Sequence, residues 1–270
     1  MPLIANARLY AITPDSTEAW QRIFSWVSER AGVEVRLTDH PPPAPLRDLW
    51  SRDDLGCVLM CGWPFACRKT KPHLLAAPVP SPKRYGDYPI YFSDFVVHKE
   101  SRFESLPDTF GGVIGWTLDD SNSGFNLPRY HLLRYRTERG GNLYARSVGN
   151  LINPLGALRA VVEGLVDVAP VDSFCHDLFR AAAHPYTLQT RTVAVTDQSP
   201  IPALVASANV PLATADRIRG ALLSAHLEPT LEPYMQKALI RHFQPIQLDA
   251  YDYTAAIAKA ADRAGYTMPA

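Results

Sequence analysis

The segment Asp119-Asp120-Ser121-Asn122-Ser123-Gly124-Phe125 combines residue types that could hold a small anion. It follows an apolar stretch typical of a strand and opens a helix, where unpaired backbone N–H groups and about half a positive charge favour an anion. Ser121 and Ser123 add hydroxyl donors. Asn122 adds an amide donor, and Gly124 lets a ligand approach the backbone. This pattern predicts an anion-binding turn without a lysine. Capping of the helix by Ser121 or Ser123 explains the same residues, and the local pattern leaves both interpretations open.

Aromatic and hydroxyl side chains at two earlier places could contribute to the same site. Trp63 lies between Gly62 and Pro64, which fix a turn after an apolar strand, and its ring could wall a cleft. Tyr91 and Ser93 alternate in an extended run, so both hydroxyls lie on one face of the strand. A tryptophan buried in the core and hydroxyls bonded to the backbone are the ordinary alternatives.

Two later turns also end strands with polar residues. Asn150 follows Val148-Gly149, and Asp172 ends an apolar run. By default Asp172 caps the next helix, but in a cleft its carboxylate could receive an ammonium group. We predict no catalytic residues, because the sequence lacks the nucleophile elbow, the HExxH zinc motif, the phosphate-binding loop and the dinucleotide-binding glycine motif.

The cysteines predict neither a metal site nor a cofactor. The sequence has four of them, Cys57, Cys61, Cys67 and Cys175. None forms a C-x-x-C pair, and no nearby histidine pair completes a zinc set. Cys57 and Cys61 lie in an apolar run and are expected to be buried thiols. A disulfide from Cys67 has no support in the sequence.

Alternating strand and helix patterns surround these candidate residues. Asp15 is expected to cap a helix whose apolar face recurs at helical spacing and which ends at Gly32. The extended run from Pro89 to His98 is long enough to pass from one sheet to another. A strand is expected over 113–118, and a helix from Ser121 to about residue 135, with Pro128 in or near its first turn.

Near the end of the chain we expect a strand over 203–207 and helices near 214–226, 231–243 and 251–265. The alternation of strands and helices predicts mostly parallel sheets with helices on both faces. Such sheets bind ligands at the carboxyl ends of their strands, so the architecture favours the same turns.

Length and charge limit the partners of the chain. Its 270 residues suffice for two medium domains, and 27 basic residues balance 27 acidic ones. No global field would attract nucleic acid or a membrane, so local groups must hold an anion. No apolar run suits membrane insertion. The first residues lack a secretory signal pattern, which predicts a cytoplasmic protein as written, or a periplasmic one if a signal was removed.

Five segments, in this order and spacing, resemble the phosphate, phosphite and phosphonate substrate-binding components of ABC transporters over nearly the whole chain. They are Cys61-Gly62-Trp63-Pro64, Tyr91-Phe92-Ser93-Asp94-Phe95-Val96-Val97, Ser101 with Ser105-Leu106-Pro107-Asp108, Asp120-Ser121-Asn122-Ser123-Gly124-Phe125, and Gly164-Leu165-Val166-Asp167-Val168-Ala169-Pro170-Val171-Asp172. The resemblance implies an α/β, two-lobed type 2 periplasmic-binding-protein fold with two crossover strands. Lobe one would hold residues 1–92 plus 195–270, and lobe two residues 93–194.

The resemblance also implies roles for single residues. The family's S-T-S-G anion turn matches residues 121–124, its cleft tyrosine looks like Tyr91, and its acidic residue for a ligand amine falls near Asp172. Two departures concern the ligand. Asn122 stands where the family has threonine, and Gly149-Asn150-Leu151 stands where the family often has Gly-Ser-His.

The sequence therefore predicts a non-catalytic protein that holds a small anionic metabolite, phosphonate-like or another oxyanion, in the cleft between two lobes. The expected ligand-binding residues are Ser121, Asn122, Ser123, Gly124, Tyr91, Ser93, Trp63, Asn150 and Asp172. An ABC transporter permease is the implied protein partner. Two alternatives remain open: a cytoplasmic enzyme on the same scaffold, similar to menaquinone-pathway proteins, and a stand-alone sensor module.

Overall fold

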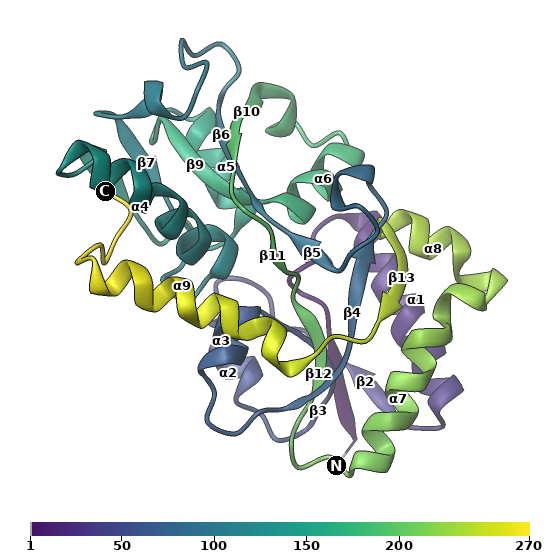
Figure 1. Cartoon of the computed structure of the whole chain (residues 1–270). Coiled ribbons are helices and arrows are strands. Elements are labelled where there is room, and N and C mark those ends of the chain that lie inside the picture. The colour runs from purple at the N-terminus through teal and green to yellow at the C-terminus, as the bar shows by residue number, and fades with distance from the viewer. Residues whose placement is uncertain (1) are drawn as a thin grey trace. The chain divides into compact units, whose positions relative to one another are not determined.

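The computed structural model describes residues 2–270 and divides into two compact units. Among the described residues, the first unit comprises 2–90 and 200–251, and the second comprises 91–199 and 252–270. The chain therefore passes between the units at 90/91, 199/200 and 251/252. Figure 1 follows the chain from its N-terminus to its C-terminus.

The first unit is built on a six-stranded sheet. In spatial order its strands are β13 (Ile240–Gln244), β4 (His73–Pro80), β12 (Ala203–Ala206), β3 (Leu55–Met60), β1 (Leu3–Asn6) and β2 (Val35–Leu37). Strand β1 runs parallel to both β2 and β3, whereas β12 is antiparallel to β3 and to β4. The sheet is thus more mixed in direction than the alternating pattern predicted, because the late strand β12 is inserted between two early ones.

Helices of the first unit are α1 (Pro14–Ala31), α2 (Leu46–Trp50), α3 (Gly62–Cys67), α7 (Leu212–Ser224) and α8 (Glu232–Lys237). Helix α1 packs against both α7 and α8, so helices from the two ends of the chain share one side of the sheet (Figure 1). The four cysteines are free thiols, and Cys57 and Cys61 are buried as expected.

Helix α1 begins two residues earlier than the sequence predicted. Thr13 is its N-cap: the Thr13 hydroxyl accepts the Ser16 N–H, and the Ser16 hydroxyl accepts the Thr13 N–H in return. The expected cap, Asp15, is instead a residue of the first turn. Pro14 explains the shift, because proline favours the first helical position and holds the preceding residue extended. The predicted end is confirmed, since Gly32 adopts the left-handed conformation with φ 60°.

The single helix expected over 231–243 is wrong. Helix α8 stops at Lys237, Leu239 takes φ 53°, and strand β13 follows. Strand β13 pairs antiparallel with β4, with His242 opposite Val79. Hydrogen bonding to a sheet edge therefore outweighs the helical spacing of the apolar residues in this stretch.

The second unit is built on a five-stranded sheet. In spatial order its strands are β10 (Thr190–Val195), β6 (Ser93–His98), β9 (Val168–Asp172), β7 (Val113–Gly115) and β8 (Arg146–Val148). Strand β7 is parallel to β8 and β9, and β6 is antiparallel to β9 and β10. The helices of this unit are α4 (Leu127–Arg139), α5 (Pro154–Val162), α6 (Ser173–Ala181) and α9 (Asp252–Arg263).

The extended run from Pro89 to His98 does pass from one sheet to another, as predicted. It is split at Phe92 into β5 (Ile90–Tyr91) and β6. Strand β5 pairs with β11 (Ser199–Pro200) in a two-stranded sheet, while β6 belongs to the five-stranded sheet.

The C-terminal segment packs on the second unit, whereas the sequence placed it with lobe one. Helix α9 lies along α4 (Figure 1), with Ile257, Ala258 and Ala261 buried. Tyr266 enters the apolar core of this unit, and the Leu143 N–H donates to the main-chain oxygen of Ala270 over 3.1 Å. The buried apolar face of α9 gives the physical reason for this placement.

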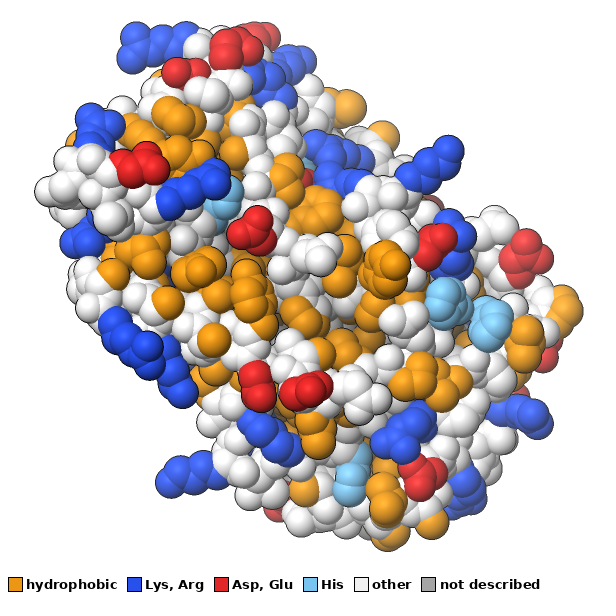
Figure 2. Space-filling model, viewed as in Figure 1, with side chains coloured by type: hydrophobic (Ala, Val, Ile, Leu, Met, Phe, Trp, Pro, Cys, Tyr) orange, Lys and Arg blue, Asp and Glu red, His pale blue; other side chains and the backbone are white. Residues whose placement is uncertain are grey.

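Charged side chains of both signs are interspersed on the face shown in Figure 2, in agreement with the net charge of zero. Within residues 2–270, no helix is long and apolar enough to cross a membrane.

Candidate functional site

The predicted anion-binding turn follows β7 after residues 116–120 and opens the longest helix of the second unit. Ser121 is the N-cap, a turn of π-helix covers Asn122–Asn126, and α4 continues from Leu127. Pro128 is the second residue of α4. The N–H groups of Asn122 and Ser123 occupy the first two helical positions, where no earlier turn offers them a carbonyl.

Ser121 shapes this turn through its hydroxyl oxygen. The oxygen accepts the Gly124 N–H over 3.0 Å, which is the capping role that the local pattern allowed. A hydroxyl that accepts one hydrogen bond still carries a proton to donate. Ser121 is also partly exposed, whereas Asn122 and Ser123 are buried. Capping and anion binding are therefore compatible at this residue, and solvent reaches the turn beside it.

Gly124 is required by internal packing. A Cβ at this position would lie 1.9 Å from the Thr117 hydroxyl oxygen, too close for any side chain. The sequence suggested that Gly124 leaves room for a ligand, but the room is filled by Thr117. Thr117 is one of the residues that sequence reasoning missed, since nothing local marks it as a neighbour of the turn.

Ser93 and Asp172 support the turn from the sheet beneath it. They lie opposite each other on the neighbouring strands β6 and β9. The Ser93 hydroxyl donates to the carbonyl of Ser123 over 2.6 Å, and the Ser123 hydroxyl donates to the Asp172 carboxylate over 3.1 Å. Ser93 is completely buried, and its hydroxyl proton is used in the hydrogen bond to the Ser123 carbonyl.

Asp172 accepts the hydrogen bond from Ser123 and also caps helix α6. Its other carboxylate oxygen accepts the N–H groups of Phe174 and Cys175 at 2.9 and 3.0 Å, which starts α6. Burial raises the pKa of Asp172 from 3.8 to about 6, although the hydrogen bonds from Cys175, Ser123 and Phe174 favour the ionised form. A buried carboxylate whose pKa approaches neutrality thus lies one hydrogen bond from the turn.

The carboxamide of Asn122 is engaged within the protein. Its nitrogen donates to the Tyr91 hydroxyl and to the Ser199 hydroxyl, each over 3.0 Å, and its oxygen accepts from the Asn126 amide over 3.0 Å. Two predicted ligand donors, Asn122 and Tyr91, are therefore bonded to each other. Ser199 and Asn126 were missed, because the spacing of 77 residues between Asn122 and Ser199 carries no local signal.

Asn150 lies at the same sheet edge but outside this network. Strands β7 and β8 are parallel, so their carboxyl ends meet, and Asn150 follows β8 in the left-handed conformation with φ 56°. Its side chain is exposed. Trp63 belongs to the first unit, at the second position of α3, and is partly exposed. Its role as a cleft wall stays a prediction.

Trp116 was not predicted, yet it stands beside two of the predicted turns. Its indole N–H donates to the Ser147 hydroxyl over 2.8 Å, and its ring meets that of Phe125 edge-on with centroids 5.0 Å apart. A Cβ on Gly149 would lie 2.0 Å from the indole ring. Position 149 therefore requires glycine, because any side chain there would clash with the indole ring of Trp116.

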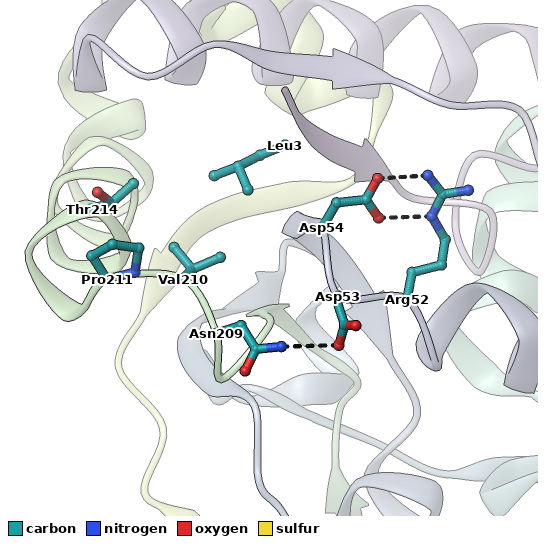
Figure 3. Close-up of a pocket in the computed structure, with 8 residues that line it drawn as sticks. All are labelled: Leu3, Arg52, Asp53, Asp54, Asn209, Val210, Pro211 and Thr214. Atoms are coloured by element: carbon teal, nitrogen blue, oxygen red, sulfur yellow. Dashed lines mark hydrogen bonds and ion pairs between the residues drawn. The ribbon is translucent and has the colours of Figure 1, made fainter. Parts of the chain in front are cut away.

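A hollow of about 620 Å³ in the first unit offers a poor alternative site for an anion (Figure 3). It lies at the amino ends of β1 and β3. Its polar lining is dominated by Asp54, paired with Arg52 at 2.6 and 2.8 Å, and by Asp53, which accepts from Asn209. Carboxylates repel an anion, and the nearby guanidinium is already occupied.

Within residues 2–270, no group of three histidine, cysteine, aspartate or glutamate side chains could hold a metal ion. The site that the second unit builds consists of helix-start amides, serine hydroxyls and one buried carboxylate. Such a group binds and orients a small polar molecule by hydrogen bonds.

Two units, each with a mixed sheet flanked by helices, define the type 2 periplasmic-binding-protein class. Residues 11–251 match the sequence profile of the periplasmic substrate-binding proteins of ABC phosphonate transporters. The chain belongs to this family, whose members are substrate-binding components of transporters and not enzymes. The family predicted from the sequence is thereby confirmed.

Solved structures agree on the fold. PhnD1 from Prochlorococcus marinus in complex with methylphosphonate matches with a TM-score of 0.79 and 13% identity, over 97% of this chain and 98% of that one. A binding-protein component of an ABC phosphonate transporter from Pseudomonas aeruginosa matches with a TM-score of 0.76 and 16% identity, over 97% and 95%. The aliphatic sulphonate binding protein SsuA from Escherichia coli matches with a TM-score of 0.58 and 12% identity, over 99% and 89%. No curated protein sequence matches the chain.

Proposed function

We propose that this solute-binding protein holds a small phosphonate-like anion at the Ser121–Gly124 turn and serves an ABC transporter. The observation that carries the proposal is the helix start at Ser121. There the first backbone N–H groups, at Asn122 and Ser123, stand beside the Ser121 hydroxyl, which still has a proton to donate. An oxyanion group is the ligand chemistry that such donors favour.

The comparisons support the tetrahedral oxyanion as the ligand class. One structural neighbour was solved with methylphosphonate, and another is a sulphonate-binding protein. Both ligand types carry several oxygens on one central atom. Such a group can accept hydrogen bonds from two adjacent N–H groups and a hydroxyl at once.

The buried Asp172 favours a ligand that also carries a positive group. The Ser123 hydroxyl donates to this carboxylate, so an anion at the turn lies near a second negative charge. An ammonium group on the ligand would compensate that charge. We therefore propose an aminoalkyl phosphonate as a better ligand than a simple alkyl phosphonate.

Calorimetric titration of the purified chain tests both statements. Methylphosphonate should bind, and aminomethylphosphonate should bind more tightly. Ser121→Ala removes the partly exposed hydroxyl donor and should weaken binding of either ligand by about 1–3 kcal/mol. Ser51→Ala is the matched control, because Ser51 is an exposed serine of the first unit whose hydroxyl donates to the nearby Asp48 carbonyl. Equal affinities for the S121A variant, the S51A variant and the unaltered chain would refute the site.

A further inference from the structure

The side chains of Asn122 and Asn126 form a buried chain of amides that reaches the connecting segments of the protein. The polypeptide passes between its two units at 90/91, 199/200 and 251/252. Hydrogen bonds from this amide pair end on Tyr91, on Ser199 and on Thr254. Each of these partners lies in the second unit within three residues of a passage point.

Asn122 contacts the first two connecting segments with one nitrogen. That nitrogen has two protons, and it donates one to the Tyr91 hydroxyl of β5 and the other to the Ser199 hydroxyl of β11. Asn122 is fully buried, so these bonds have no competition from water. A threonine, which the family resemblance places at this position, has one hydroxyl proton and cannot donate to both partners.

Asn126 reaches the third connecting segment. Its amide nitrogen donates to the Asn122 oxygen over 3.0 Å and to the carbonyl of Thr254 over 2.8 Å. Thr254 lies in the first turn of α9 and is fully buried. One helical turn further along, the buried Arg129 binds Asp262 over 2.7 Å, so α9 is anchored along its length to the helix that starts at Ser121.

We infer that Asn122 and Asn126 are positioning residues that link occupancy of the Ser121–Gly124 turn to the three connecting segments. The inference rests on the proposed function, because it takes the backbone N–H groups of Asn122 and Ser123 as the anion donors. An anion bound there fixes the backbone from which the Asn122 side chain projects. Fixing that backbone holds both hydroxyl contacts in place, and through Asn126 it also holds the start of α9.

Hydrogen–deuterium exchange with and without methylphosphonate, and with inorganic phosphate as a second probe, measures this link. In the unaltered chain we expect exchange to slow at least about threefold in residues 121–124 and in the peptides covering 91–93, 197–199 and 252–255. Slowing in the turn without any in those three peptides would overturn the inference and leave the proposed function intact. No slowing in the turn with either probe would refute both.

Two variants separate linkage from a merely structural role. Asn122→Ala should abolish the ligand-induced slowing at 91–93 and 197–199, because it removes the nitrogen that donates to both Tyr91 and Ser199. Asn126→Ala should abolish the slowing at 252–255 and leave the first two segments responsive. A purely structural role predicts faster exchange in all states with the ligand response unchanged. Asn209→Ala, which removes an exposed amide contact to Asp53 in the first unit, is the matched control and should keep all three responses.

The unaltered chain decides the question even if a variant fails to fold, because its own exchange pattern can contradict the linkage. Loss of the response at all three segments in the N209A control would also overturn it, since that amide lies outside the second unit.

Discussion

At the scale of single residues, hydrogen bonding and burial act in opposite directions on the ionisation of Asp172. It caps α6 and accepts from Ser123, and both contacts favour the carboxylate. Burial favours the neutral acid more strongly, which raises the pKa of Asp172 to about 6. Because the folded state holds the proton more tightly than the unfolded chain, this group stabilises the fold fully below its unfolded pKa of 3.8. That stabilisation is lost as the pH rises through about 6.

Asp172→Asn should therefore gain stability relative to the unaltered chain as the pH rises. Asparagine keeps an acceptor oxygen for the start of α6 but does not titrate. We expect the difference in free energy of unfolding to move in favour of the D172N variant by about 2–3 kcal/mol between pH 4 and pH 7. Urea denaturation at the two pH values measures it.

Asp108→Asn provides the control for this prediction. Hydrogen bonds from Ser105 lower the pKa of Asp108, so its ionised form stabilises the fold, and that contribution is lost as the pH falls. The difference in free energy of unfolding between the D108N variant and the unaltered chain should therefore move in favour of the unaltered chain as the pH rises. A pH-independent difference for the D172N variant would show that the buried carboxylate does not titrate in this range.

The backbone of Gly124 packs against the side chain of Thr117, which leaves no room for a Cβ at position 124. Gly124→Ala places a methyl group against Thr117 and should destabilise the chain by about 1–3 kcal/mol. Thr117→Ala in the same variant removes the nearest atom and should recover part of the loss. Gly141→Ala, with no atom within 4 Å of the added Cβ, should be close to neutral. Equal melting temperatures for the G124A and G141A variants would contradict this packing.

At the scale of elements, the start of α1 shows how one proline sets a helix boundary. Thr13→Ala removes the hydroxyl that accepts the Ser16 N–H, while the Thr13 N–H can still donate to the Ser16 hydroxyl, and should cost about 1 kcal/mol in thermal unfolding. Asp15→Ala removes only a first-turn charge, paired at 3.6 Å with Lys237, and should cost a few tenths of a kcal/mol. A larger loss of stability for the D15A variant than for the T13A variant would place the cap at Asp15.

The elements that build the candidate site are those with the clearest sequence signals. Strand β7, the serine-flanked helix start and strand β9 all lie within a few residues of where the sequence placed them. The edge strand β13 was missed, because its partner β4 lies about 160 residues earlier in the chain, outside any local window.

At the scale of the whole molecule, the C-terminal segment belongs to the second unit and should respond with it. Tyr266→Ala removes a ring from the core of that unit and should destabilise it by about 3–5 kcal/mol. Hydrogen exchange should then accelerate in β7 and β8 but not in β1 and β3. Phe243→Ala, a buried ring of the first unit, should give the reverse pattern. Acceleration of β1 and β3 by the Y266A variant would assign residues 252–270 to the first unit instead.

Local signals were enough for the sequence to determine the alternation of strands and helices, the family, and the turn at Ser121, since caps, apolar spacing and glycines act over a few residues. Tertiary structure alone decided what that turn touches. The two hydroxyl partners of Asn122 lie 31 and 77 residues away, and Asn126 donates to the Thr254 carbonyl across 128 residues. Buried polar groups must find hydrogen bonds wherever packing brings donors and acceptors together, and that packing is a property of the folded chain as a whole.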